Sequence, residues 1–356
     1  IEFFLSNFKI ANIQVHQMST NKNWLNLTIE ETLEPDLPIC DPHHHLWEFR
    51  SERVANRYLM DEIQADLASG HNIVSTVFVE CGAMYRAYGS EEMRPVGETE
   101  FVNGIAAMSA SGLYGTTRIA AGIVGQADLC LGKKVAAVLD AHLAAGGGRF
   151  RGIRRQANWD ASEDIHNGRF VDRPHIYMED NFRQGFAELA KRELSFEAWC
   201  FHTQIGELIS LAQKFPKTKI ILNHFGGPLG VGPYAQERDA IFSKWRKDIA
   251  ELATCPNVYA KLGGINMEIN GFDWHLQDRP PSSKALMEST RAYYEHTIEH
   301  FGCERCMFES NFPVDMVSCS YNILWNSFKR LTANYGEEEK ANLFHDTASE
   351  VYRVGD

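Results

Sequence analysis

The sequence predicts an α/β fold, namely a (β/α)8 TIM barrel of parallel strands with an extra C-terminal helix. Short β-branched runs alternate along the chain with longer stretches that carry apolar residues at helical spacing. Eight strand-then-helix units follow one another, and eight is the number that closes such a barrel. The chain has 356 residues, a length that these barrels reach as one domain.

The strand-like runs lie at 39–42, 73–80, 118–124, 150–155, 194–201, 219–223, 257–262 and 305–309. The stretches between them are amphipathic, as in the segment with Val135, Val138, Leu139 and Leu143. A last helical stretch, 337–352, is expected to pack on the outside of the barrel. The competing fold is a doubly wound open sheet, which is disfavoured because no Gly-x-Gly-x-x-Gly follows the first strand.

The barrel is expected to span residues 37–354, after an N-terminal tail of residues 1–36. Met18 and the residues after it read like a natural start, so 1–17 is interpreted as upstream sequence or a tail. This stretch has no small-residue cleavage site, which argues against a signal peptide. No low-complexity tract or linker indicates a second domain.

Composition limits the partners that the protein can have. The net charge is −12 and no basic stripe offsets it, which argues against nucleic acid. No window approaches the roughly 18 apolar residues that span a bilayer. The eight cysteines are scattered, as reduced thiols are in cytoplasmic proteins. We therefore expect a cytoplasmic protein with a small-molecule substrate, and its size and class are compatible with a homodimer.

The most informative motif is Asp41-Pro42-His43-His44-His45, at the end of the first predicted strand. Side chains alternate along a strand, so His43 and His45 should point to one side and His44 to the other. Two imidazoles projecting together form half of a divalent-metal site or an acid/base pair. The structural alternative is a strand end whose histidines bond to nearby loops.

Other predicted strands also end in ionisable residues. In a TIM barrel the chemistry lies at the carboxyl-terminal ends of the strands, so these side chains should meet at one rim. Arg154 and Arg155 are adjacent, so only one can enter the barrel, where it would bind an anionic group or pair with a barrel carboxylate. The rim residues are Glu80 after strand 2, Arg154 and Arg155 after strand 4, His202 after strand 5 and His224 after strand 6.

The eighth strand ends in Glu309-Ser310-Asn311-Phe312-Pro313-Val314-Asp315. A hydrolytic site of this kind would place a carboxylate there, as a general base or a metal ligand. Asn311 occupies that place, flanked by Glu309 and Asp315.

These motifs resemble the amidohydrolase-2 branch of the amidohydrolase superfamily. The resemblance rests on His43-x-His45, the run from Asn223 to Pro228 and the run from Glu309 to Asp315, and it extends from about 37 to 354. Within this branch the chain is most similar to TIM-barrel lactonases that act on sugar lactones and on 2-pyrone-4,6-dicarboxylate.

The resemblance implies a role for each matching residue. His43 and His45 would bind a metal or position water, and His202 would be a third metal ligand or bond a substrate oxygen. His224 would polarise the scissile carbonyl or stabilise the oxyanion. Many relatives carry an aspartate where this chain has Asn311, and an amide cannot accept a proton at neutral pH. The cofactor is therefore expected to be one divalent ion, zinc or manganese, with a metal-free site as the alternative.

The leading hypothesis is hydrolysis of a carboxylated or sugar-derived lactone by water attack on the ring carbonyl. Water would be activated by the metal or by Asp315, Glu309 or Glu80, with Asn311 beside it. His224 and Arg154 would stabilise the developing charge. Two other hypotheses are a metal-dependent, non-oxidative decarboxylase of an aromatic or muconate-type acid, and a catalytically inactive barrel that only binds a ligand.

Overall fold

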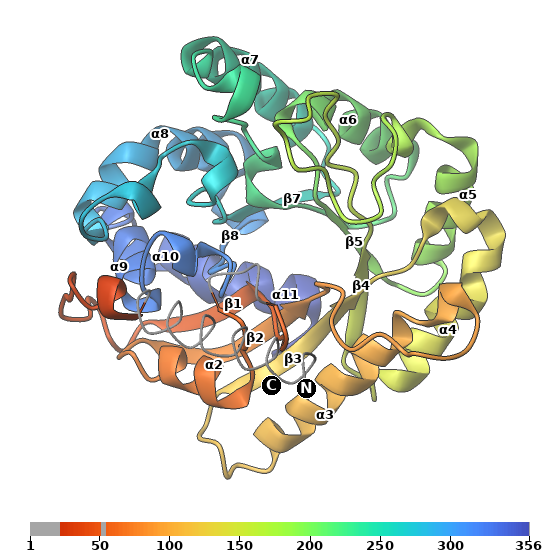
Figure 1. Cartoon of the computed structure of the whole chain (residues 1–356), viewed down its shortest axis with the longest axis horizontal. Helices are drawn as coiled ribbons and strands as arrows, with labels where there is room; N and C mark the ends of the chain where they lie inside the picture. The colour runs from red at the N-terminus through yellow and green to blue at the C-terminus, as the bar shows by residue number, and fades with distance from the viewer. Residues whose placement is uncertain (1–21, 51–54, 356) are drawn as a thin grey trace, which may run out of the picture.

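The computed structural model describes residues 22–50 and 55–355. Its eight strands form one parallel sheet in the sequential order β1 to β8. Each strand is followed by a helix that covers its outer side, and the ring is seen end-on in Figure 1. The strands are β1 Pro38–His44, β2 Asn72–Val79, β3 Arg118–Gly125, β4 Phe150–Arg154, β5 Ser195–Ala198, β6 Ile220–Leu222, β7 Val258–Leu262 and β8 Cys306–Phe308. The predicted fold class is confirmed.

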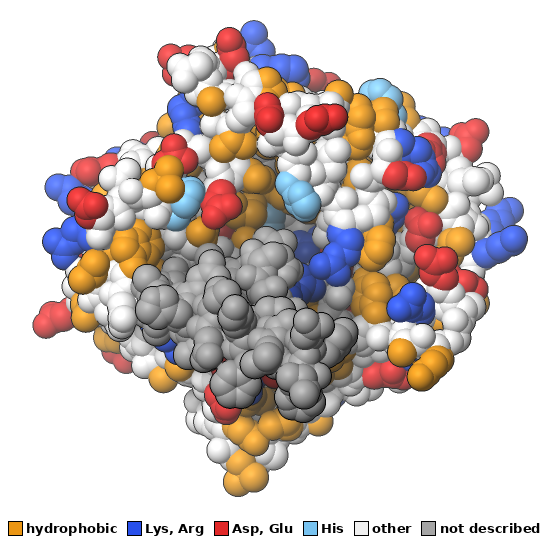
Figure 2. All heavy atoms as spheres, in the orientation of Figure 1, with side chains coloured by type: hydrophobic (Ala, Val, Ile, Leu, Met, Phe, Trp, Pro, Cys, Tyr) orange, Lys and Arg blue, Asp and Glu red, His pale blue; other side chains and the backbone are white. Residues whose placement is uncertain are grey.

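The helices that follow the strands pack through apolar faces against the outside of the sheet, in a continuous core. They are α2 Met60–Leu67, α3 Val96–Ala110, α4 Val135–Ala145, α5 Asp180–Ala190, α6 Ile205–Lys214, α7 Arg238–Ala253, α8 Ser283–Phe301 and α9 Tyr321–Leu331. Charged side chains of both signs are interspersed on the face shown in Figure 2. None of the helices in the described ranges combines the length and hydrophobicity needed to cross a membrane.

The first and last strands meet at the carboxyl-terminal end of the barrel. The backbone N–H of His45 donates to the carbonyl of Phe312 at 2.8 Å, and that of Asn311 donates to the carbonyl of His43 at 2.9 Å. Backbone bonds are obligatory for buried chain, and these two join the ends of β1 and β8. The junction therefore brings the predicted histidine motif against the predicted strand 8 motif.

The C-terminal helix is not placed as the sequence predicts. The stretch 337–352 divides into α10 Glu337–Ala341, a π-helical turn Asn342–Asp346 and α11 Thr347–Tyr352. Ala348, Val351 and Tyr352 pack with inward-facing barrel residues such as Val77 and Ile221, so α11 closes the barrel interior. The prediction that this segment packs outside is wrong for α11, whose apolar side chains cover the end of the barrel core, whereas Leu343 and Phe344 in the π-helical turn pack with the outer core.

The N-terminal segment falls partly outside the described residues, which begin at Lys22. The indole N–H of Trp24 donates to the carbonyl of Gln277 at 2.9 Å, and the hydroxyl of Thr28 donates to the carbonyl of Pro280 at 2.7 Å. The backbone N–H of Leu33 donates to Asn326 at 2.9 Å. The part of the predicted tail from residue 22 onward is therefore bonded to the barrel.

Candidate active site

Three histidines from two strands converge at the carboxyl-terminal end of the barrel. The ring centroid of His43 lies 5.0 Å from that of His45 and 4.6 Å from that of His224. His44 points the other way, where its Nε2 lies 2.8 Å from the hydroxyl of Thr76. The predicted alternation at β1 is confirmed, as is the convergence of His224 with that motif.

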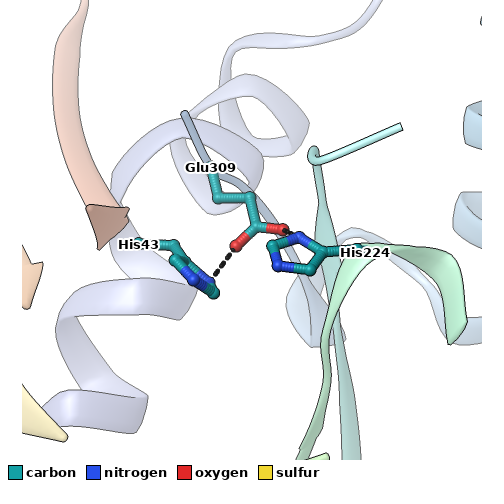
Figure 3. A group of neighbouring side chains, drawn as sticks. All are labelled: His43, His224 and Glu309. Carbon is teal, nitrogen blue, oxygen red and sulfur yellow. Dashed lines mark hydrogen bonds and ion pairs between the residues drawn. The ribbon is translucent and has the colours of Figure 1, made fainter. Parts of the chain in front are cut away.

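Glu309 joins two of these histidines (Figure 3). Its Oε1 lies 2.6 Å from Nδ1 of His224, and its Oε2 lies 2.6 Å from Nδ1 of His43. The carboxylate is fully buried. The first contact has hydrogen-bond geometry, whereas the second is close but misaligned, so Oε2 has no well-aligned donor. We regard both as polar contacts and the His224 contact as the stronger one.

The carboxylate of Glu309 orients the imidazole of His224. A carboxylate can only accept, so Nδ1 of His224 carries a proton, and in the neutral ring Nε2 then keeps its lone pair. Burial, and then the charge of Lys261, hold the pKa of His43 well below its usual range, so His43 is neutral. His224 faces the cavity described below, where its free nitrogen can accept a proton. The arrangement is that of a base oriented by a buried acid.

The backbone around His224 is strained. His224 has φ 51° and Phe225 has φ 58°, both in the left-handed region. Such conformations cost about 1–3 kcal/mol each and are common at functional sites. Gly264, after β7, makes room for the ring, since a Cβ there would lie 2.0 Å from Nδ1 of His224. Gly263-Gly264 after a predicted strand was the sequence signal for this close approach, and it was missed.

Two cations flank His43 inside the barrel. Lys261 in β7 is fully buried, forms a 2.9 Å ion pair with Glu197 and lies 3.4 Å from Nδ1 of His43. The guanidinium of Arg154 lies 3.3 Å from Nε2 of His43. Sequence reasoning missed Lys261, although a lysine inside an otherwise apolar strand is unusual. Both nitrogens of His43 therefore face a fixed positive charge.

By donor type, His43, His224 and Glu309 could hold a divalent metal. One ligand atom from each lies within 4.8 Å of the others, and imidazole with carboxylate suits zinc or manganese. Both nitrogens of His43 already have a side-chain donor close by, Lys261 at 3.4 Å and Arg154 at 3.3 Å, and each of these cations is itself paired with a carboxylate. A metal held by His43 would have to displace one of these contacts, so the donor set fits a metal and the arrangement around His43 does not.

The two strand 8 residues that were predicted to be catalytic are hydrogen-bonded to each other, but only Asn311 lines the cavity. Asn311 lines the cavity and has φ 56°. Asp315 is fully buried and accepts a hydrogen bond from the amide of Asn311 at 2.9 Å. Burial raises the pKa of Asp315 to about 8. Asp315 is therefore mostly protonated at neutral pH, which does not suit a general base.

The raised pKa of Asp315 makes stability depend on pH. The unfolded carboxyl has the ordinary aspartate pKa of 3.8, whereas burial raises the pKa of the folded one to about 8. Folding stability should therefore fall as pH rises between these values. We expect Asp315→Asn to remove this loss and to raise the free energy of unfolding by a few kcal/mol at about pH 9, with a smaller gain at about pH 5. Urea unfolding of both proteins at the two pH values measures this difference in the free energy of unfolding. An equal difference at both pH values would contradict the raised pKa of Asp315.

His45 stands beside this group in a neutral form. Its Nδ1 lies 2.8 Å from the carbonyl of Val79, so this nitrogen donates and Nε2 keeps the lone pair. Burial, and then the charge of Arg154, hold the pKa of His45 well below its usual range. Its predicted role as a metal ligand stays a prediction.

His202 lies apart from these residues. The strand-like run predicted over 194–201 ends as a strand at Ala198, and His202 begins a short helical turn. Its Nδ1 accepts the backbone N–H of Leu229 at 3.3 Å, and its ring meets Tyr234 edge-on. Among the described residues it does not line the cavity of the His224 site. The structure thus gives His202 contacts with the loop after β6, where its predicted role as a ligand or substrate-binding residue stays a prediction.

The two adjacent arginines of β4 point apart, as predicted. Arg154 enters the barrel, and its Nε donates to Glu80 at 2.8 Å. Arg155 pairs with Asp128 at 3.2 Å and lines a different pocket. The carboxylate of Glu80 is thus engaged with Arg154, and it does not line the cavity where a substrate would bind. The internal ion pair that was the alternative for Arg154 is present.

A cavity of about 290 Å³ opens above His224. It is lined by three kinds of side chain: aromatic and aliphatic groups, amides, and basic residues. They are His45, Trp47, Arg50, Cys81, Arg154, Gln156, Asn158, His166, Asn167, Gly168, Arg169, Trp199, Phe201, His224, Met267, Ile269, Asn311 and Val314. The volume suits a small ring compound, and the amides can bond to its oxygens.

The barrel and the convergent histidine–carboxylate site define a TIM-barrel hydrolase. The amidohydrolase family model matches residues 40–354, so the chain belongs to the amidohydrolase family. It is 33% identical over 339 residues to the uncharacterized protein y4mH of Sinorhizobium fredii, covering 90% of this chain and 99% of that one. The predicted membership of this family is confirmed.

The chain is also similar to a protein named as a lactonase and to a solved amidohydrolase structure. The chain is 25% identical to the L-fucono-1,5-lactonase of Burkholderia multivorans, over 58% of this chain and 64% of that protein. A solved amidohydrolase from Burkholderia multivorans, with bound zinc, superposes with a TM-score of 0.67 at 22% identity. That alignment covers 89% of this chain and 99% of the other, and it supports the shared fold.

Proposed function

We propose that this protein hydrolyses a lactone, with His224 as the general base that activates water. The observation that carries the proposal is the 2.6 Å bond between Nδ1 of His224 and the buried carboxylate of Glu309, at the edge of the cavity. This bond leaves Nε2 free to take a proton from water. The similarity to a protein named L-fucono-1,5-lactonase favours a lactone as the substrate class.

The reaction would proceed by addition and ring opening. The oxygen of water bonds to the carbonyl carbon while its proton passes to Nε2 of His224. The bond from the carbonyl carbon to the ring oxygen then breaks, and the imidazolium returns the proton to that oxygen, giving a hydroxy acid. Arg154 lines the cavity and can face the developing oxyanion. In this scheme His224 acts as a base and not as the oxyanion donor first expected.

A screen of lactones by acid release tests the proposal. We expect the unmodified protein to release one equivalent of acid per lactone opened, without carbon dioxide. Carbon dioxide from aromatic or muconate-type acids, with no turnover of any lactone, would favour the decarboxylase hypothesis. Ligand binding with no turnover of either class would favour the inactive barrel.

We also expect hydrolysis to be independent of added metal. The two nitrogens of His43 already contact Lys261 and Arg154, at 3.4 Å and 3.3 Å, and a metal held by His43 would have to displace one of these side chains. Dialysis against a strong chelator should leave kcat within about twofold, because the proposed base is a protein side chain. The measurement is activity before and after chelation, alongside elemental analysis of the protein. One zinc or manganese ion per chain, with activity lost on its removal and restored by its return, would contradict this expectation.

A further inference from the structure

The cavity above His224 carries an excess of positive charge. Arg50, Arg154 and Arg169 all line it, and its lining includes no aspartate or glutamate among the described residues. Figure 2 shows Lys and Arg side chains near the middle of this face. The cavity is therefore basic although the whole protein has a net charge of −12. Such a pocket attracts an anionic ligand.

Two of the three arginines have no carboxylate partner within the ranges 22–50 and 55–355. Arg154 is neutralised by Glu80 at 2.8 Å. Arg50 donates to the carbonyl of Cys81, and its guanidinium lies 5.1 Å from the ring centroid of Trp47. Arg169 donates to the carbonyl of Gly82 at 3.0 Å. Carbonyl contacts orient the two guanidinium groups without cancelling their charge.

The two unpaired arginines are held at neighbouring positions. Their acceptors, the carbonyls of Cys81 and Gly82, belong to consecutive residues after β2. Gly82 has φ +72°, and a Cβ there would lie 1.8 Å from Nη1 of Arg169, so only glycine leaves room for this guanidinium. Arg50 is only 8% exposed, and a buried cation without a counter-charge is costly. Two consecutive carbonyls of the loop after β2 therefore hold both cations at the cavity.

We propose that Arg50 and Arg169 bind a carboxylate on the substrate, which makes the substrate a carboxylated lactone and not a neutral sugar lactone. This inference rests on the proposed lactone hydrolysis and assigns the substrate class. Guanidinium groups bind carboxylates through paired N–H donors, and each arginine keeps donors beyond its carbonyl contact. Arg154 has a separate role, beside the reacting carbonyl.

The experiment compares two lactones that differ only in charge. One is a γ-lactone with a free carboxylate on the ring, and the other is its primary amide. We expect the unmodified enzyme to prefer the carboxylate. Arg50→Gln and Arg169→Gln should each lower kcat/KM for the carboxylate roughly 10–100-fold, mainly through KM, and should change the amide by less than about threefold. Arg173→Gln is the matched control, because Arg173 lies in the same loop as Arg169 and pairs with Glu179 at 2.6 Å.

Binding of tetrahydrofuran carboxylate, which has the ring and the anion but no ester bond, tests carboxylate binding separately from lactone hydrolysis. Arg169 is exposed, so Arg169→Gln is expected to fold and keeps the test valid if Arg50→Gln does not. If neither lactone is opened but the probe binds, and Arg169→Gln weakens it tenfold or more, lactone hydrolysis fails and the anion site stands. Equal rates on both lactones, equal losses on both in the variants, or no binding of the probe would overturn the anion site.

Discussion

Glu309→Gln is expected to lower kcat for lactone hydrolysis by roughly 10²–10⁴-fold, the range associated with loss of general-base catalysis. The amide of glutamine can offer an N–H to Nδ1 of His224, which favours the tautomer with its proton on Nε2. His224 would then point a proton, and not a lone pair, at the attacking water. A carboxylate can only accept, and Oε1 of Glu309 is hydrogen-bonded to Nδ1 of His224 at 2.6 Å.

The measurement is steady-state hydrolysis of the best lactone from the acid-release screen, with thermal unfolding of each variant in parallel. Glu188→Gln is a matched control, because Glu188 is a largely buried carboxylate on α5 that pairs with Lys191 and Arg192. The control should keep its activity. If the Glu309→Gln enzyme unfolds like the unmodified protein and its kcat is within about threefold of the unmodified value, Glu309 does not orient the general base.

His224→Gln is expected to cost at least as much as Glu309→Gln, again roughly 10²–10⁴-fold in kcat, because it removes the group that takes the proton. Its effect should not add to that of Glu309→Gln. Once His224 is gone, Glu309 has no base to orient, so the double variant should work about as slowly as His224→Gln alone.

The double-variant cycle distinguishes a relay from two independent contributions. If the losses from His224→Gln and Glu309→Gln multiply in the double variant, the two residues act separately and the proposed pairing is wrong. His44→Gln is a suitable control for replacement of a buried histidine, because His44 points away and contacts Thr76. We expect it to leave kcat nearly unchanged.

The positions of the site histidines could be predicted because strand geometry dictates them. His43 and His45 share a side through the alternation of β1, and His224 follows a short apolar strand whose end must lie at the rim. Alternation along the strand also predicts that only one of Arg154 and Arg155 enters the barrel. In a regular strand, the direction of a side chain follows from its position in the sequence.

The residues that were missed or misplaced lie where the backbone is irregular or where a charge is buried. Strand 8 ends at Phe308, and Asn311 then takes a left-handed conformation, so alternation no longer tells which of Glu309 and Asn311 meets the histidines. His202 was counted as the end of a strand that stops at Ala198. Lys261 was read as part of an apolar strand because its partner, Glu197, lies on another strand and becomes visible only in the fold.

Nitrogen-15 NMR of histidine-labelled protein reports which ring nitrogen of His224 carries a proton, with the His224→Gln protein used to assign the His224 signals. We expect that, near neutral pH, Nδ1 of His224 carries the proton and Nε2 does not, and that Glu309→Gln weakens or reverses this preference. A His224 ring with a proton on Nε2 in the unmodified enzyme would rule out His224 as the general base, since the nitrogen facing the cavity could not then accept a proton from water.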